Sequence, residues 1–164
     1  MTMPGRQRGV FLIEALMGIL IFSLGILTLV AMQTAAVSAQ SDAQYRIEAA
    51  NLADQIVSEI WVNVNRTADP ATTRDSLEAF RHLEGGGNCN FSGAASGAKQ
   101  VEDWVAAVTA AGTGLPGATE AMQQILVNTV PGSFNQVSVT VCWKAPMDAA
   151  DAPAHRHTVV TFIN

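Results

Sequence analysis

Hydrophobic and polar positions divide the chain into stretches with different patterns. The first nine residues, MTMPGRQRG, are polar and basic, and residues 10–33 are almost entirely apolar. Glu14 is the only charged residue in this apolar stretch, and the next is Asp42. About 20 apolar residues in a helix, at about 1.5 Å per residue, are enough to cross the hydrocarbon core of a bilayer. The stretch is therefore predicted to be a membrane helix, with Arg6 and Arg8 keeping its start on the cytoplasmic side.

Helical periodicity continues after the apolar stretch but becomes amphipathic. Apolar residues gather on one side of the predicted helix: Ala49, Leu52, Ala53, Ile56, Val57, Ile60, Trp61 and Val64. Polar residues gather on the other side: Arg46, Glu48, Asp54 and Glu59. After Gly25 neither proline nor glycine interrupts the pattern, so we predict one helix from about Val10 to Asn65, about 80 Å long. Its first half is apolar on all sides, and its second half has one apolar face suited to packing against a sheet.

The middle of the chain is predicted to form short helices joined by loops. Residues 73–83 and 99–111 carry apolar residues at helical spacing, with Leu77, Phe80 and Leu83 expected to point inward. Residues 84–97 include a glycine triplet and are predicted to be loop. The triplet lacks the lysine and the strand–helix context of a phosphate-binding loop, so no nucleotide chemistry is assigned to it.

Strand periodicity dominates the last third of the chain. Residues 136–144 alternate strictly between apolar and polar side chains, and residues 122–130 and 157–163 are predicted to be the flanking strands. These strands predict an antiparallel sheet of about three to four strands packed on the second half of the long helix, an α+β fold.

The predicted organisation of the chain has three parts: a leader at 1–9, a membrane or filament-core helix at 10–40, and a domain at 41–164. The domain comprises the end of the helix at 41–65, a connecting region at 66–121 and the sheet at 122–164.

Two ordinary explanations of the N-terminal segment each leave part of it unexplained. A cleaved secretory signal has an apolar core of about 7–15 residues, shorter than this one, although residues 35–39 resemble the small-residue site that signal peptidase cuts. A plain membrane anchor explains the length and the arginines but not Glu14, because a carboxylate inside an apolar helix costs a few kcal/mol unless it finds a partner. Neither explanation supplies a group that neutralises Glu14.

The segment RGVFLIE at residues 8–14 resembles the leader junction of type IV prepilins and type II secretion pseudopilins. The resemblance implies that a membrane peptidase cuts between Gly9 and Val10 and that the new amine of Val10 is N-methylated. It also implies that Glu14, the fifth mature residue, pairs with the α-amine of a neighbouring subunit and sets the axial register. The sequence departs from the family pattern at Val10, where phenylalanine is commonest, and in having no proline within the apolar helix.

Within this family the chain is most like a minor pilin of the PilV (GspI-like) type, on residues 103–104, 115–116 and 139–143. This implies a low-abundance subunit that primes or tips the filament and contacts other minor and major pilins through its N-terminal helix. Prepilin peptidase, the inner-membrane assembly platform and lipid are implied partners, and a tip adhesin is a further candidate. The implied location is the inner membrane with a periplasmic C-terminal domain, and then the cell-surface pilus. The alternatives are a type II secretion minor pseudopilin, a DNA-uptake minor pilin and an anchored periplasmic domain that never polymerises.

Charge and side-chain chemistry narrow the function further. Fourteen acidic residues outnumber nine basic ones, and no basic stripe follows the apolar stretch, so nucleic-acid binding is not expected. Cys89 and Cys142 lie beyond the predicted span, in an oxidising compartment, and form either one disulfide or two unpaired small hydrophobic residues. His82, His155 and His157 lack the spacing of a metal site and are predicted to lie on the surface. No nucleophile or acid–base motif occurs, so neither an enzyme nor a cofactor is expected.

Overall fold

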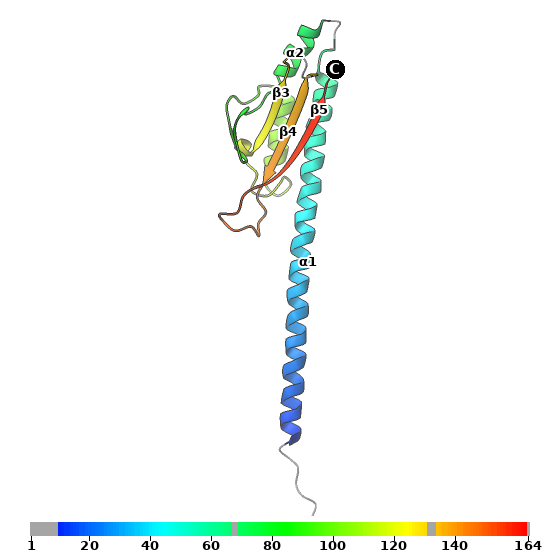
Figure 1. The fold of residues 1–164 in the computed structure, drawn as a ribbon, viewed down its shortest axis with the longest axis vertical. Helices are drawn as coiled ribbons and strands as arrows, with labels where there is room; N and C mark the ends of the chain where they lie inside the picture. Colours follow the sequence, from blue (N-terminus) through cyan, green and yellow to red (C-terminus); the bar gives the residue numbers. More distant parts are fainter. Residues whose placement is uncertain (1–9, 67–68, 131–133, 164) are drawn as a thin grey trace, which may run out of the picture. The chain divides into compact units, whose positions relative to one another are not determined.

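The computed structural model describes residues 10–66, 69–130 and 134–163, and the chain separates into two compact units, Met1–Ser41 and Asp42–Asn164. Helix α1 (Val10–Asn63) has 54 residues and contributes to both units (Figure 1). The N–H of Val64 still donates to the carbonyl of Ile60 at 3.0 Å, so helical hydrogen bonding continues one residue beyond α1. The long helix predicted from the uninterrupted pattern is confirmed, with its end two residues earlier than expected.

Within the first unit, α1 exposes its apolar side chains on all sides. The exposed fractions of the large hydrophobic residues range from 44% for Ile26 to 74% for Phe11. The helix is long and apolar enough to cross a membrane, and none of its most apolar stretch is buried within the chain. This part of α1 therefore depends on something outside the described chain, either lipid or other apolar helices, to cover it.

The second unit has its own core between α1 and a three-stranded antiparallel sheet. The strands are β3 (Gln123–Asn128), β4 (Gln136–Trp143) and β5 (His155–Phe162), in the order β3-β4-β5. Val139 of the central strand pairs with Ile125 on one side and Val159 on the other. The apolar face of α1 that meets this core has four buried members, Ala49, Ala53, Ile56 and Ile60, and Val64 directly after α1 is buried with them. The predicted meander is confirmed, and so is the predicted inward face of the helix except at Trp61, which is 38% exposed.

Two short helices complete the packing around the second half of α1. Helix α2 (Pro70–Glu78) begins three residues earlier than predicted, because Asp69 caps it and Pro70 starts it. The Asp69 carboxylate accepts the N–H of Ala71 at 3.0 Å, which also lowers the pKa of Asp69. Helix α2 ends before residues 79–83, which were predicted to continue it, although Leu77, Phe80 and Leu83 are buried as expected.

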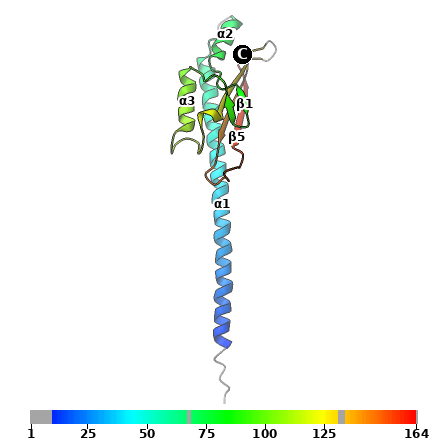
Figure 2. The same ribbon diagram turned by 90° about the vertical axis from the view of Figure 1, so that its left-hand side faces the viewer.

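Helix α3 (Lys99–Thr109) lies beside α1 (Figure 2) and ends two residues earlier than predicted. Its Trp104 is buried and donates its indole N–H to the carbonyl of Leu52 at 2.8 Å. Val101 and Val108 on the same side of α3 join the core. A single 3₁₀ turn, η1 (Glu120–Met122), then leads into β3. Together these contacts attach the connecting region to the helix that the sheet also covers.

The predicted loop at residues 84–97 is in part a small hairpin, which corrects the prediction. Strands β1 (Gly85–Gly87) and β2 (Asn90–Ser92) pair antiparallel through a two-residue turn. Both turn residues have positive φ, 52° at Asn88 and 60° at Cys89, as tight hairpin turns require. Gly86 also has positive φ, and a Cβ there would lie 2.4 Å from the Asn90 carbonyl. The glycine triplet thus forms the first strand of the hairpin, and Gly86 permits a backbone conformation and a close approach that a side chain would prevent.

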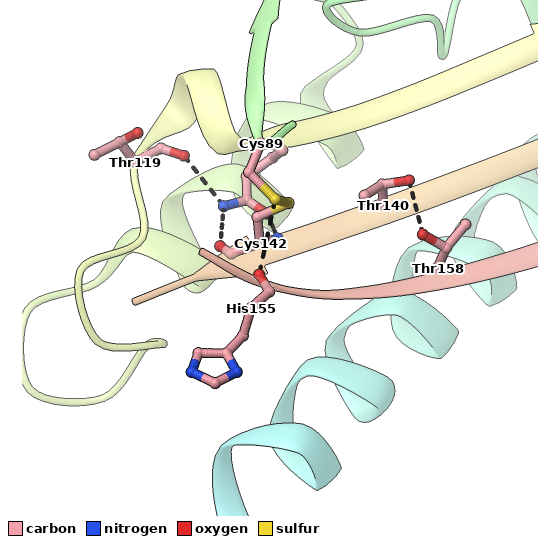
Figure 3. Close-up of a disulfide and its surroundings, with 7 residues drawn as sticks. Cys89, Thr119, Thr140, Cys142, His155 and Thr158 are labelled. Atoms are coloured by element: carbon pink, nitrogen blue, oxygen red, sulfur yellow. Dashed lines mark hydrogen bonds between the residues drawn. A yellow bond between two sulfur atoms is a disulfide. The ribbon is translucent and has the colours of Figure 1, made fainter. Parts of the chain in front are cut away.

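The hairpin is fixed to the sheet by a disulfide between Cys89 and Cys142 (Figure 3). Of the two states that the sequence allowed for these cysteines, the structure contains the bridged one. Beside the bridge, the buried amide of Gln123 donates to the carbonyls of Cys142 at 3.0 Å and Thr119 at 3.1 Å. Its oxygen accepts the N–H of Cys142 at 3.3 Å, so this buried polar side chain is well satisfied.

Candidate functional site

The first candidate site is the start of α1, around Glu14. Arg6, Arg8, Gly9 and the bond that follows Gly9 lie outside the described residues, and the side chain of Val10 is not described. The predicted leader, cleavage and methylation therefore stay predictions. Glu14 lies in the first turns of α1 and is exposed.

Glu14 differs from three hydroxyl side chains in the apolar half of α1. The hydroxyls of Ser23, Thr28 and Thr34 donate to carbonyls of the preceding turn at 2.7–3.1 Å, so the helix satisfies them itself. Glu14 has no hydrogen-bond or ion-pair partner among the described residues. The first backbone N–H groups of α1 lack acceptors within the helix, but none of those described donates to the Glu14 carboxylate. Any partner of the carboxylate must therefore come from outside this part of the chain.

The apolar surroundings of Glu14 decide what kind of partner is needed. Its neighbours Phe11, Leu12, Ile13 and Leu16 are 62–74% exposed and carry no charge. Once lipid or other helices cover these residues, an ionised carboxylate costs about 2.5–3.5 kcal/mol at mid-helix on an insertion scale. A cation brought beside it recovers part of that cost and fixes the position of the helix that carries the cation.

A second cluster of ionisable residues lies in the second unit, around His155. Its Nε2 is 3.1 Å from Asp148, and its Nδ1 is 3.7 Å from Asp42 on α1. The ring stacks on the buried Trp143, with centroids 5.5 Å apart. Asp42 also pairs with Arg46 at 2.9 Å. The cluster connects α1, β5 and the loop before β5, and it can hold these elements together but presents no nucleophile.

The pKa of Asp148 in this cluster is lowered. Burial acts to raise it, but hydrogen bonds from His155 and from the N–H of Ala145 outweigh that effect. The sequence did not indicate the cluster, because its members at positions 42, 148 and 155 come close only after the sheet has packed on α1.

His82 is buried, which corrects the prediction that all three histidines lie on the surface. Its exposed fraction is 2%, and its Nδ1 accepts the N–H of Ser96 at 3.2 Å. Its backbone exchanges two hydrogen bonds of 3.0 Å with Ile125, so the residue extends the sheet beyond β3. Burial lowers the pKa of His82, and the negative charge of Glu120 opposes this shift.

Neither the residues around His155 nor those around His82 are arranged for metal binding. Within residues 10–66, 69–130 and 134–163, no group of three or more His, Cys, Asp or Glu side chains could hold a metal ion.

No protein-family model, no curated protein and no solved structure matches the chain. A proposed function therefore depends on the residues themselves, above all on Glu14, the one charged side chain in the apolar stretch of α1.

Proposed function

We propose that the protein is a type IV pilin-like subunit that is inserted in a membrane by α1, trimmed at its N-terminus and packed by α1 into a filament. One observation carries the proposal. Glu14 is the only carboxylate in residues 10–41 of α1, has no partner among the described residues, and lies where the apolar side chains of the helix are exposed on all sides. A soluble domain would bury such a helix, and a plain anchor has no use for the acid.

The proposed partner of Glu14 is the α-amine of a neighbouring subunit. Cleavage after Gly9 would create this amine on Val10, at the start of the apolar stretch. Because both groups lose water in a filament core, the pair adds little net stability but penalises every axial position in which one charge is left alone. The carboxylate would thus select one register among many similar apolar contacts.

Within this family we infer a minor pilin, which joins other minor pilins to prime or tip the filament. The precursor would reside in the inner membrane with its second unit in the periplasm, and it would meet prepilin peptidase and the assembly platform there. The disulfide between Cys89 and Cys142 supports an oxidising compartment for that unit. The absence of proline within the apolar helix supports a minor subunit over a major one.

Mass spectrometry of the protein extracted from membranes tests the proposal directly. The expected chain begins at Val10 and carries one methyl group on its α-amine. A chain that still begins at Met1 would contradict the processing, and one that begins near residue 41 would identify α1 as an ordinary cleaved signal. Blocking the peptidase should return the precursor with all nine leader residues, which controls for non-specific trimming.

A further inference from the structure

The outer edge of the sheet, along β5, offers backbone hydrogen-bonding groups that no described residue uses. Asn135 and Ile163 continue the pairing of β4 with β5, and the N–H of Ile163 donates to the Asn135 carbonyl at 3.1 Å. In an antiparallel ladder, bonded and non-bonded pairs alternate. The odd-numbered residues of β5 therefore bond to β4. The N–H and C=O groups directed away from β4 belong to Arg156, Thr158, Val160 and Phe162.

The opposite edge of the sheet shows that this assignment is consistent. Ile125 of β3 exchanges both of its backbone hydrogen bonds with His82, on the side away from β4. Ile125 pairs with Val139, and Val139 pairs with Val159 of β5, so the alternation runs through all three strands without a break. The outer edge of β3 is thus paired at Ile125 by His82, whereas among the described residues no segment pairs with β5 on its outer side.

The side chains along the open edge are suited to pairing with another strand. From His157 to Phe162 the strand has no Lys, Arg, Asp, Glu or Pro, the residues that usually protect an exposed edge. Val160 and Phe162 are each 49% exposed on the outer face. Phe134, at φ 54° next to the residue that pairs with Ile163, is a further exposed apolar residue near this end of the strand, at 70%.

We propose that the β5 edge binds an extended segment of a partner protein by strand addition. Between Arg156 and Phe162 the edge is about 20 Å long, which fits a segment of about seven residues. Four N–H and four C=O groups would bond to its backbone. Its side chains beside Val160 and Phe162 would be β-branched or aromatic, and an acidic residue would face Arg156.

The charge on the edge favours a different protein over a second copy of this chain. The sequence of β5, HRHTVVTF, contains no acidic residue, so a second β5 offers no anionic partner for Arg156. The site lies in the second unit and uses no residue of the apolar half of α1. The inference therefore goes beyond the proposed filament function and can fail separately from it.

A synthetic strand tests the proposal. The probe is the capped peptide Glu-Thr-Val-Thr-Val-Thr-Val-Thr, added to the full-length protein in detergent micelles, with amide hydrogen exchange followed residue by residue. Without peptide, the amides of Thr158, Val160 and Phe162 should exchange fast and those of Val159 and Thr161 slowly. With saturating peptide, the three fast amides should slow by roughly tenfold or more.

Two variants and a modified peptide make the test specific. Val160→Pro removes an N–H that points away from β4, so the ladder is kept while the peptide loses a bond. Val160→Thr keeps the N–H and a β-branched side chain and should bind like the wild type. A peptide N-methylated at alternate residues lacks the donors on one edge and should not protect, which gives the same information if Val160→Pro does not fold.

Three results would overturn the inference. The first is no protection at millimolar peptide, and the second is equal protection by the N-methylated peptide. The third is protection of the same amides in the protein alone that increases with protein concentration, because this would identify a second copy as the occupant.

Discussion

At the scale of single residues, Glu14 and His82 stand out among the described ionisable groups by their surroundings. Glu14 is exposed on an apolar helix and has no partner among the described residues, whereas His82 is buried and has one partner for its two ring nitrogens. The missing partner of Glu14 indicates an intermolecular contact. The burial of His82 indicates that the stability of the fold depends on pH. Each leads to a prediction that a single substitution can test.

Replacing Glu14 by Ala or Gln should abolish filament incorporation but leave leader cleavage intact. Both changes remove the charge that would select the register, and Gln keeps the shape of the side chain. The measurement is the fraction of protein in sheared filaments, with the mature N-terminus checked by mass spectrometry. Gln33→Ala, a change of another polar residue on the same helix, is the control and should incorporate normally. Normal incorporation of both Glu14 variants would contradict the role of this carboxylate in setting the register, whereas absence of the wild type itself from the filaments would favour an anchored domain that never polymerises.

The stability of the second unit should fall as the pH drops below about 6.5. Neutral His82 accepts the Ser96 N–H, whereas the protonated ring would direct a donor at a donor. Burial lowers the pKa of His82 below its ordinary value of 6.5, so the unfolded chain takes up the proton first. The stabilisation is therefore complete above pH 6.5 and is lost as the pH falls towards the lower pKa of the folded state.

Urea unfolding at several pH values between 7 and 5 measures this effect. The wild type should lose more stability across the interval than His82→Asn, whose side-chain oxygen can accept the same N–H without titrating there. His155 and His157 are present in both proteins and cancel in the comparison. The lowered pKa of Asp148 acts only below about 3.8, outside this window. Equal slopes for the two proteins would show that His82 does not titrate with unfolding.

At the scale of elements, the apolar face of α1 joins the sheet, the two short helices and the connecting region in one core. Ile56 and Ile60 are fully buried against this core, whereas Ile47, on the same helix, is 64% exposed. The same residue type therefore occurs in opposite surroundings within three turns of one helix. This contrast separates the contribution of packing from that of helix propensity.

Ile56→Ala should destabilise the second unit by about 2–5 kcal/mol, because it leaves a cavity between α1 and the sheet. Ile47→Ala, the matched control, should change the stability by less than about 0.5 kcal/mol. Urea unfolding of the full-length protein in detergent, followed by the fluorescence of Trp104 and Trp143, measures both. A loss for Ile56→Ala as small as that of the control would mean that the sheet does not pack on α1 as described.

The elements that the sequence predicted best are those with long, unbroken side-chain patterns. Helix α1 has no proline or glycine after Gly25, and β4 alternates over eight residues, so period and length agreed. The hairpin β1–β2 was missed because Gly85–Gly87 has no side chains to alternate. The buried position of His82 and the cluster around His155 depend on tertiary contacts that no local pattern encodes. Glu14 was recognised because one charge in an apolar stretch is visible without a structure.

At the scale of the whole molecule, the two units differ in whether their apolar residues are buried. The first unit buries none of its most apolar stretch, and the second buries its apolar residues in a core of its own. The proposed membrane and filament contacts would therefore act on the first unit while the second keeps its fold. The second unit is also the part that carries the disulfide and the open β5 edge, so covalent stabilisation and the proposed partner contact occur in the same domain.

Removing the disulfide should destabilise the second unit by about 2–4 kcal/mol without changing its fold. Cys89 and Cys142 are separated by 53 residues, so the bridge closes a long loop and restricts the unfolded chain strongly. The double variant Cys89→Ala and Cys142→Ala avoids leaving a reactive thiol and keeps the buried position 142 apolar. Its unfolding in urea should match that of the wild type treated with a reductant, while the Gln123 hydrogen bonds to Cys142 backbone groups preserve the adjacent strand.

Equal stability of oxidised, reduced and variant protein would show that the bridge adds no constraint. In that case the connecting region is held by its non-covalent contacts alone, among them those of Trp104 and His82, and a reducing environment would leave the domain as stable as an oxidising one.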